Sequence, residues 1–189
     1  MAYKSIFYYQ SADYICILKI KGYKFMKKIL SSILVCGTLL YAGSFSKGLE
    51  LLGEGKEVKA YETFFTAAKA GNIDAQMFLG QMHLDGIGTE VDHQKAFFWL
   101  SKAANSDDVE AQYLLGFMYE NGLKVKVDIK RATQLYKKAA KKGDILSQYS
   151  LAIIYKEGKG EVKKDIKEAF KWLNMVQSAR DKVELVASS

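Results

Sequence analysis

Three consecutive segments of this chain repeat one pattern of residues with a period of 36. They are residues 67–102, 103–138 and 139–175, and the third carries one extra residue in its central loop. A fixed period of this length predicts stacked supersecondary units, each of which buries its apolar face against a neighbour. We therefore expect function on an extended surface rather than in a catalytic pocket.

Each repeat contains the start and stop signals of two helices. Short oxygen-bearing side chains that can cap a first helix recur in one register, at Asn72, Asp108 and Asp144. Glycines suited to a left-handed C-cap follow them, at Gly86, Gly122 and Gly158. A second set of N-cap residues comes after a short loop, at Asp92, Asp128 and Asp165. The repeat is thus predicted to be a pair of helices.

The pattern of large and small residues predicts how the two helices pack. Gly80 and Gly116 lie inside the first helix, where glycine costs roughly 0.5–1 kcal/mol relative to alanine, so their recurrence indicates close helix approach. Large apolar residues and small alanines alternate along the second helix at helical spacing. The chain contains no proline, which suits a helical fold. We predict an all-α solenoid of antiparallel helix pairs.

The flanking segments extend this pattern in both directions. Residues 45–66 fit a partial N-terminal repeat, because Ala60 lies 36 residues before Ala96. Residues 176–189 are more polar and are predicted to form a C-terminal cap and tail. A solenoid needs such a cover because no further repeat buries its last apolar face.

Residues 26–44 have the organisation of a bacterial signal peptide. Met26, Lys27 and Lys28 form a positive start, and an apolar run follows from Ile29 to Tyr41. Small residues come next at Ala42, Gly43 and Ser44, which predicts cleavage before Phe45 or, alternatively, before Lys47. The expected destination is the periplasm or the exterior of a bacterial cell.

Two alternatives for the N-terminus stay open. The apolar stretch of ~17 residues is at the short edge of what spans a bilayer, so an uncleaved signal anchor would be the one expected membrane contact. Residues 1–25 make a poor leader, with a dense mixture of Tyr, Ile and Lys around Asp13. We interpret them as a mis-assigned upstream extension, with translation starting at Met26 rather than at Met1.

Charge and cysteine content exclude several classes of function. The whole chain carries a net charge of +7, but residues 1–44 contribute six basic residues against one acidic residue, or +5. The remainder has a net charge of +2, so nucleic-acid binding lacks electrostatic support. Both cysteines, Cys16 and Cys36, precede residue 45, and the repeats therefore offer no thiol nucleophile and no thiolate metal site.

No catalytic or metal-binding constellation is predicted. The two histidines, His83 and His93, lie near Asp85, Glu90 and Asp92, but they do not form an HExxH motif. An SxxK pattern spans Ser44 to Lys47, across the predicted cleavage site, and no KTG or SDN motif accompanies it. We expect no cofactor, no metal ion and no enzyme activity from these residues.

The repeat resembles a known family. Ala111-Gln112, Leu115-Gly116 and Tyr119, followed by a glycine loop, an aspartate and a Lys-Ala-Ala end, resemble the Sel-1-like repeat, a relative of the tetratricopeptide repeat. The departures are His83 in place of the tyrosine, Lys124 in place of a loop glycine and Ala152 in place of the helix glycine. The resemblance implies a right-handed superhelix that acts as a scaffold or adaptor for other proteins.

The same resemblance supplies an alternative function. Some exported relatives carry a cysteine pair in each repeat, and some of these are named as β-lactamases. A β-lactamase or cell-wall hydrolase is therefore the alternative to the scaffold. The repeats of this chain lack those cysteines, which weakens that comparison.

One stripe on the first helices is the candidate binding surface. The positions that differ most between repeats lie at i, i+4 and i+7, which share a helix face. The proposed partner-binding residues on this stripe are Met77, Gln81, Tyr113, Phe117, Tyr149 and Ile153. Aromatic residues are favoured at interfaces, so a concave groove for a partner protein or peptide is one interpretation. Packing between adjacent repeats is the other interpretation.

Overall fold

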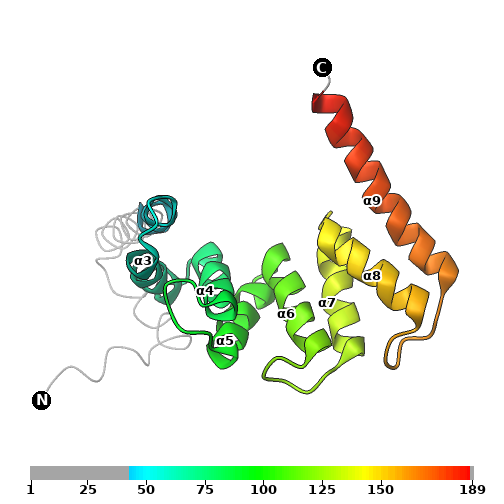
Figure 1. Ribbon diagram of the computed structural model, residues 1–189, viewed down its shortest axis with the longest axis horizontal. Coiled ribbons are helices and arrows are strands. Elements are labelled where there is room, and N and C mark those ends of the chain that lie inside the picture. The colour runs from blue at the N-terminus through cyan, green and yellow to red at the C-terminus, as the bar shows by residue number, and fades with distance from the viewer. Residues whose placement is uncertain (1–42, 188–189) are drawn as a thin grey trace, which may run out of the picture. The chain divides into compact units, whose positions relative to one another are not determined.

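The computed structural model describes residues 43–187. This part of the chain folds into helices joined by short loops and contains no strand, so the predicted all-α class is confirmed (Figure 1). The predicted extension at residues 1–25 and most of the predicted signal peptide lie outside the described residues. The helices are residues 43–53, α3 (Glu57–Lys69), α4 (Ile73–Asp85), α5 (His93–Asn105), α6 (Val109–Asn121), α7 (Ile129–Lys141), α8 (Ile145–Glu157) and α9 (Ile166–Ala187).

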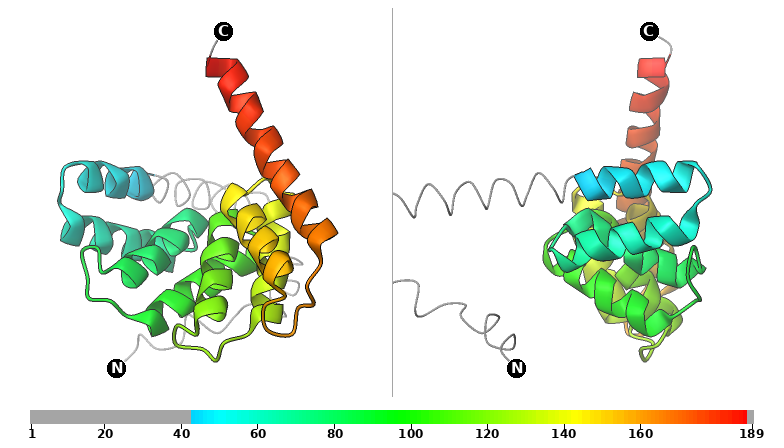
Figure 2. Two further views of the ribbon diagram at one scale, coloured as in Figure 1. Left: turned by 45° about the vertical axis from the view of Figure 1, so that its right-hand side comes forward. Right: turned by 90° about the vertical axis from the view of Figure 1, so that its left-hand side faces the viewer.

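The helices are stacked in the order of the sequence. Within each pair, α4 packs on α5, α6 on α7 and α8 on α9, and between pairs α3 contacts α4, α5 contacts α6, and α7 contacts α8. Figures 1 and 2 show this succession of antiparallel helices, in which each pair lies against the next. The predicted solenoid of helix pairs is thus confirmed.

Caps define where the helices begin and end. The side-chain oxygens of Asn72, Asp108 and Asp144 each accept a hydrogen bond of 2.7 Å from a backbone N–H in the first turn. Each such bond contributes about 1 kcal/mol to stability. The first helices end at glycines with left-handed φ angles of 72°, 67° and 73°, namely Gly86, Gly122 and Gly158. The loop then returns to its own helix, because the N–H of each following aspartate donates to a carbonyl near the end of the first helix.

A glycine in the first helix allows close contact with a large side chain of the second helix. A Cβ on Gly116 would lie 2.7 Å from Cε1 of Tyr136, and a Cβ on Gly80 would overlap Cγ of Leu100. Gly48 in helix 43–53 has the same relation to the ring of Phe64. The predicted packing role of these glycines is confirmed.

The first helix pair has a shorter loop than the later pairs. Leu100 follows Gly80 by 20 residues and Tyr136 follows Gly116 by 20, whereas Phe64 follows Gly48 by 16. This difference of four residues interrupts the sequence period, although the contact between the two helices is retained. The segment before α4 is therefore a helix pair, and it shares its core with α4 and α5.

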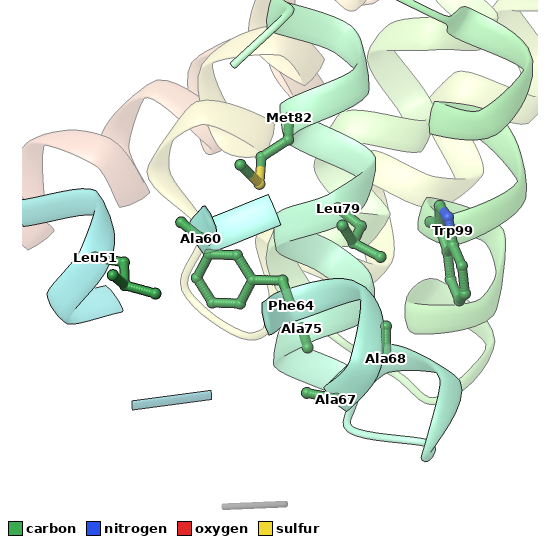
Figure 3. Close-up of a cluster of buried hydrophobic side chains, with 9 residues drawn as sticks. All are labelled: Leu51, Ala60, Phe64, Ala67, Ala68, Ala75, Leu79, Met82 and Trp99. Atoms are coloured by element: carbon green, nitrogen blue, oxygen red, sulfur yellow. The ribbon is translucent and has the colours of Figure 1, made fainter. Parts of the chain in front are cut away.

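The apolar core runs along the stack as a series of clusters. Figure 3 shows the first cluster, in which Phe64 of α3 and Leu79 of α4 lie beside side chains of helix 43–53 and α5. Phe45 packs against this cluster, with its ring centroid 5.6 Å from the rings of both Phe64 and Phe78. Each cluster joins one pair to the next, which is how repeat units without individual cores become stable.

Two loop residues adopt left-handed backbone conformations without being glycine. Asp107 has φ 69° and Lys124 has φ 65°, at positions where the other repeats have glycine. Such a conformation costs a residue with a side chain about 1–2 kcal/mol. Asp107 offsets this cost, because its carboxylate accepts from Gln112 Nε2 at 2.7 Å and binds Lys142 Nζ at 2.6 Å. Lys124 has the same left-handed backbone conformation as the glycines at its position in the other two repeats, Gly88 and Gly160, although it is not a glycine.

The last helix does not end where the earlier second helices end. α3, α5 and α7 have 13 residues each, whereas α9 has 22 and continues to Ala187. The residues predicted as a separate C-terminal cap therefore extend the final helix as far as the structure describes them. Within residues 43–187, no helix has both the length and the apolar character needed to cross a bilayer.

Substituting a packed helical glycine tests the close approach of the two helices. We expect Gly80→Ala to destabilise the protein by about 1–3 kcal/mol, because the new methyl group overlaps the Leu100 side chain. The matched control is Gly53→Ala, since no atom lies within 4 Å of a Cβ built there. Urea unfolding followed by circular dichroism measures both changes. Equal stability of the two variants would contradict the packing role.

Candidate functional site

The stripe predicted on the first helices carries exposed aromatic residues on α6 and α8. Phe117 is 40% exposed and Tyr149 is 54% exposed. Tyr113 and Ile153 are half-buried beside them, and Gln81 is half-buried on α4. Tyr113 and Tyr149 occupy one repeat position, and Phe117 and Ile153 occupy the next position of the stripe. The first helices of two consecutive repeats thus present aliphatic and aromatic side chains.

Tyr113 packs against a buried side chain and is also partly exposed at the surface. Its ring centroid lies 5.7 Å from that of Tyr136, which is fully buried. Tyr136 donates its hydroxyl hydrogen to Glu120 Oε2 at 2.8 Å, and Lys159 Nζ donates to Glu120 Oε1 at 2.7 Å. Burial, followed by the carboxylates of Asp144 and Glu120, raises the pKa of Tyr113, so the phenol is neutral. The ring contact with Tyr136 thus packs Tyr113 of α6 against α7.

Met77 was predicted to lie on the binding surface, and this prediction is wrong. It is 6% exposed and belongs to a core cluster that includes Ala111 and Leu115 of α6. α4 also contacts α6 directly, so the stripe position on α4 is covered by the next repeat. A partner cannot reach this side chain, and the candidate surface is reduced to Gln81 and the residues on α6 and α8.

His83 is a buried packing residue of α4. It is fully buried on α4, with Nε2 3.2 Å from the hydroxyl of Tyr61 and the two rings 5.4 Å apart. The corresponding pair in the next repeat is Phe97 with Tyr119, whose ring centroids are 5.7 Å apart. No group of three or more His, Cys, Asp or Glu side chains within residues 43–187 is arranged to hold a metal ion.

A shallow hollow of about 420 Å³ lies beside the loop between α6 and α7. Two of its charged groups are engaged in other contacts: Asp128 accepts from the Arg131 backbone N–H at the start of α7, and Arg131 Nη1 donates to the Tyr119 hydroxyl at 3.0 Å. Its described lining includes no serine, threonine, cysteine or histidine. Its lining residues are Phe97, Tyr119, Val125, Lys126, Val127, Asp128 and Arg131.

The lysine of the SxxK pattern is paired with a carboxylate. Lys47 Nζ binds Glu50 Oε1 at 2.8 Å, and this hydrogen bond raises the pKa of the lysine. A lysine general base needs the opposite shift, which burial or a neighbouring cation would provide. The observed shift in pKa is thus the opposite of what a lysine general base would need.

The charge is divided along the stack, a feature that the total of +2 conceals. Residues 43–123 contain six Lys and Arg against twelve Asp and Glu, a net charge of −6. Residues 124–171 contain fourteen basic against six acidic residues, a net charge of +8. Counting charge within successive repeats would have revealed this division from the sequence. The C-terminal half thus attracts acidic groups.

His83 makes the stability of the fold depend on pH. Burial, and then the charge of Lys95, lowers the pKa of His83 below its usual value. The unfolded chain therefore takes up this proton at a higher pH than the folded protein does, and stability falls as the pH drops from about 8 to 5.5. We expect His83→Phe to reduce this loss, as measured by thermal unfolding across that range. The control is His93→Asn, which removes the other histidine. The same pH dependence in His83→Phe as in the unchanged protein would contradict the prediction.

Comparison with known proteins agrees with this geometry. The sequence model of the Sel1 repeat matches residues 73–108, 109–144 and 145–175. Among solved structures, the Sel1 repeat protein from Oxalobacter formigenes is 29% identical with a TM-score of 0.67, and the match covers 73% of this chain and 58% of that chain. A protective antigen of uropathogenic Escherichia coli with an SLR fold is 28% identical with a TM-score of 0.66, covering 74% of this chain and 30% of that one.

The comparisons also limit what can be transferred. This chain spans 58% and 30% of the lengths of these two relatives, which are longer proteins. The search of curated proteins produced no match. The three consecutive matches to the repeat model cover more than half of the chain, in phase with the helix pairs α4–α5, α6–α7 and α8–α9. The chain belongs to the Sel1 repeat family.

Proposed function

We propose that this protein is an exported bacterial scaffold that binds a partner protein or peptide through the stripe on α6 and α8. The observation that carries the proposal is the exposure of Phe117 and Tyr149 on consecutive first helices, beside Tyr113 and Ile153. Sel1 repeats are helical repeats of the kind used for protein–protein interaction. An extended surface of this type suits a polypeptide better than a small molecule.

The chemistry of the stripe specifies the kind of partner segment. Aromatic side chains provide large contact area at small entropic cost, and they are enriched among interface residues that dominate binding. Tyr149 also keeps a phenolic hydroxyl for hydrogen bonding at the surface. The half-buried Gln81 continues the stripe onto α4 with an amide group. A segment with apolar or aromatic side chains and a few polar groups would complement this surface.

Substitution by a photocrosslinking residue tests the binding surface in living cells. We expect p-benzoylphenylalanine at Phe117 to form discrete adducts with a partner, and these adducts should weaken when Tyr149→Ala removes the second aromatic contact. The matched control places the same residue at Phe98, which is 50% exposed on α5 and lies outside the stripe. The absence of adducts from position 117, or identical adducts from both positions, would contradict the proposed surface.

Export rests on residues 26–44, and the fold supports one of the two predicted cleavage sites. Cleavage before Phe45 would keep this aromatic ring against Phe64 and Phe78. Cleavage before Lys47 would remove it and expose part of the first cluster to water, which costs about 1.5–3 kcal/mol for a phenylalanine side chain.

The N-terminus of the protein purified from the cell envelope tests export. We expect mass spectrometry to find a mature chain that begins at Phe45. A chain beginning at Lys47 would reject the packing argument but retain export. A chain that keeps residues 26–44 in the cytoplasmic fraction would contradict export.

A further inference from the structure

The outward face of α9 carries an apolar stripe that no helix within residues 43–187 covers. The stripe consists of three residues at i, i+4 and i+7, which share one helix face. Their exposed fractions are 44% for Ile166, 60% for Phe170 and 37% for Leu173. These values are large for apolar side chains at positions that the earlier repeats use for packing.

The earlier second helices show what normally covers this face. Phe170 occupies the repeat position of Tyr61 and Phe97, whose rings pack against His83 and Tyr119 of the next first helix. At the same position on α7, Thr133 is 5% exposed. The position of Leu173 is fully buried in both earlier Sel1 repeats, as Leu100 and Tyr136. The stripe on α9 is therefore one half of a repeat interface.

α9 does not turn back to supply the missing helix. The earlier second helices end in turns with left-handed residues, at Gly71, Asp107 and Gly143, which lead into the next first helix. The corresponding position on α9 is residue 180, and the helix continues through it to Ala187. In the earlier repeats the helix that covers the second helix is the next one in the chain. The residues that directly follow the start of α9 cannot supply such a cover, because they continue α9 itself.

The surroundings of the stripe select an acidic occupant. Lys163, Lys164, Lys167 and Lys171 are exposed around the start of α9, in the half of the protein that carries a net charge of +8. Lys167 and Lys171 lie on the helix next to the apolar stripe, on its solvent side. Lys171 Nζ lies 3.3 Å from Glu168 Oε1 of its own helix, in an exposed pair of little strength. Acidic side chains at the edge of a docked helix would pair with Lys167 and compete with Glu168 for Lys171. Complementary charge of this kind speeds association and selects partners.

A second copy of this chain fits the stripe poorly. The first helix of the stack presents Glu50 at the position where Met82, Met118 and Ile154 are buried. Docking that helix on Phe170 would therefore bury a carboxylate against an apolar surface. Pairing of two α9 helices would instead bring two sets of lysines together.

We propose that α9 binds an acidic amphipathic helix of a partner protein, which packs on it as a first helix packs on the preceding repeat. An aromatic side chain of the partner would cover Phe170, as Tyr119 covers Phe97, and its acidic groups would face Lys167 and Lys171. This surface is distinct from the stripe on α6 and α8, so it adds a second contact to the scaffold and does not depend on the first.

A peptide taken from this chain provides the probe. Residues 108–121 form the natural cover of α5, and they carry Tyr119 together with the acidic residues Asp108, Glu110 and Glu120. We expect the labelled peptide, with blocked termini, to bind full-length protein saturably in fluorescence anisotropy. Phe170→Asp should weaken binding by about tenfold or more, because it removes the central apolar contact. Phe98→Asp is the control and should retain binding, since Phe98 is also exposed, at 50%, but lies on α5.

Further measurements separate the alternatives. A peptide in which the three acidic residues are replaced by their amides should bind more weakly, and equal affinity would overturn the acidic partner. No binding, or equal binding by Phe170→Asp, would overturn the docking face. Light scattering that shows a dimer lost in Phe170→Asp would assign the face to a second copy and reject the proposal. The double variant Phe117→Ala, Tyr149→Ala changes the stripe on α6 and α8. If this variant loses peptide binding while Phe170→Asp keeps it, the inference about α9 is rejected and the proposed function stands.

Discussion

The contact between a small residue and a large one inside each helix pair is the constraint on which the rest of this structure depends. Gly80 meets Leu100 and Gly116 meets Tyr136, and the first pair repeats the contact between Gly48 and Phe64. A glycine brings the helix backbones close enough for one large side chain to fill the space between them. Because this contact sets the spacing within a pair, the caps and loops can repeat with nearly the same geometry.

That internal constraint leaves other helix faces free to vary, and the functional proposals rest on those faces. The constant positions of the first helices are buried, whereas Phe117 and Tyr149 project from the same helices toward solvent. The end of the stack differs again, since α9 exposes Leu173, whose position is buried in the two preceding repeats as Leu100 and Tyr136. One repeated unit can thus offer a lateral surface and a terminal surface with different chemistry.

Charge adds direction to this stack. The N-terminal half is acidic and the C-terminal half is basic, and ion pairs such as Asp107–Lys142 and Glu120–Lys159 join an acidic residue of one repeat to a basic residue of the next. Exposed ion pairs contribute little to stability, commonly about 0.2–1 kcal/mol. Their arrangement matters more for partner choice, because a long-range field favours acidic partners near α9 and disfavours them near the first pair.

The sequence by itself determined the helix pairs, their caps and the repeat phase, because these depend on local hydrogen bonding and on spacing along one helix. It also predicted that Gly80 and Gly116 have a packing role. Only the tertiary structure decided that Met77 is buried by α6, that Tyr113 leans on Tyr136, and that Gly48 restores the same contact across a shorter loop. Burial depends on which helices lie alongside, and no spacing within a single helix reveals that. The exposed face of α9 was likewise recognised only in the tertiary structure, because its side chains had to be compared with the equivalent side chains of the earlier repeats.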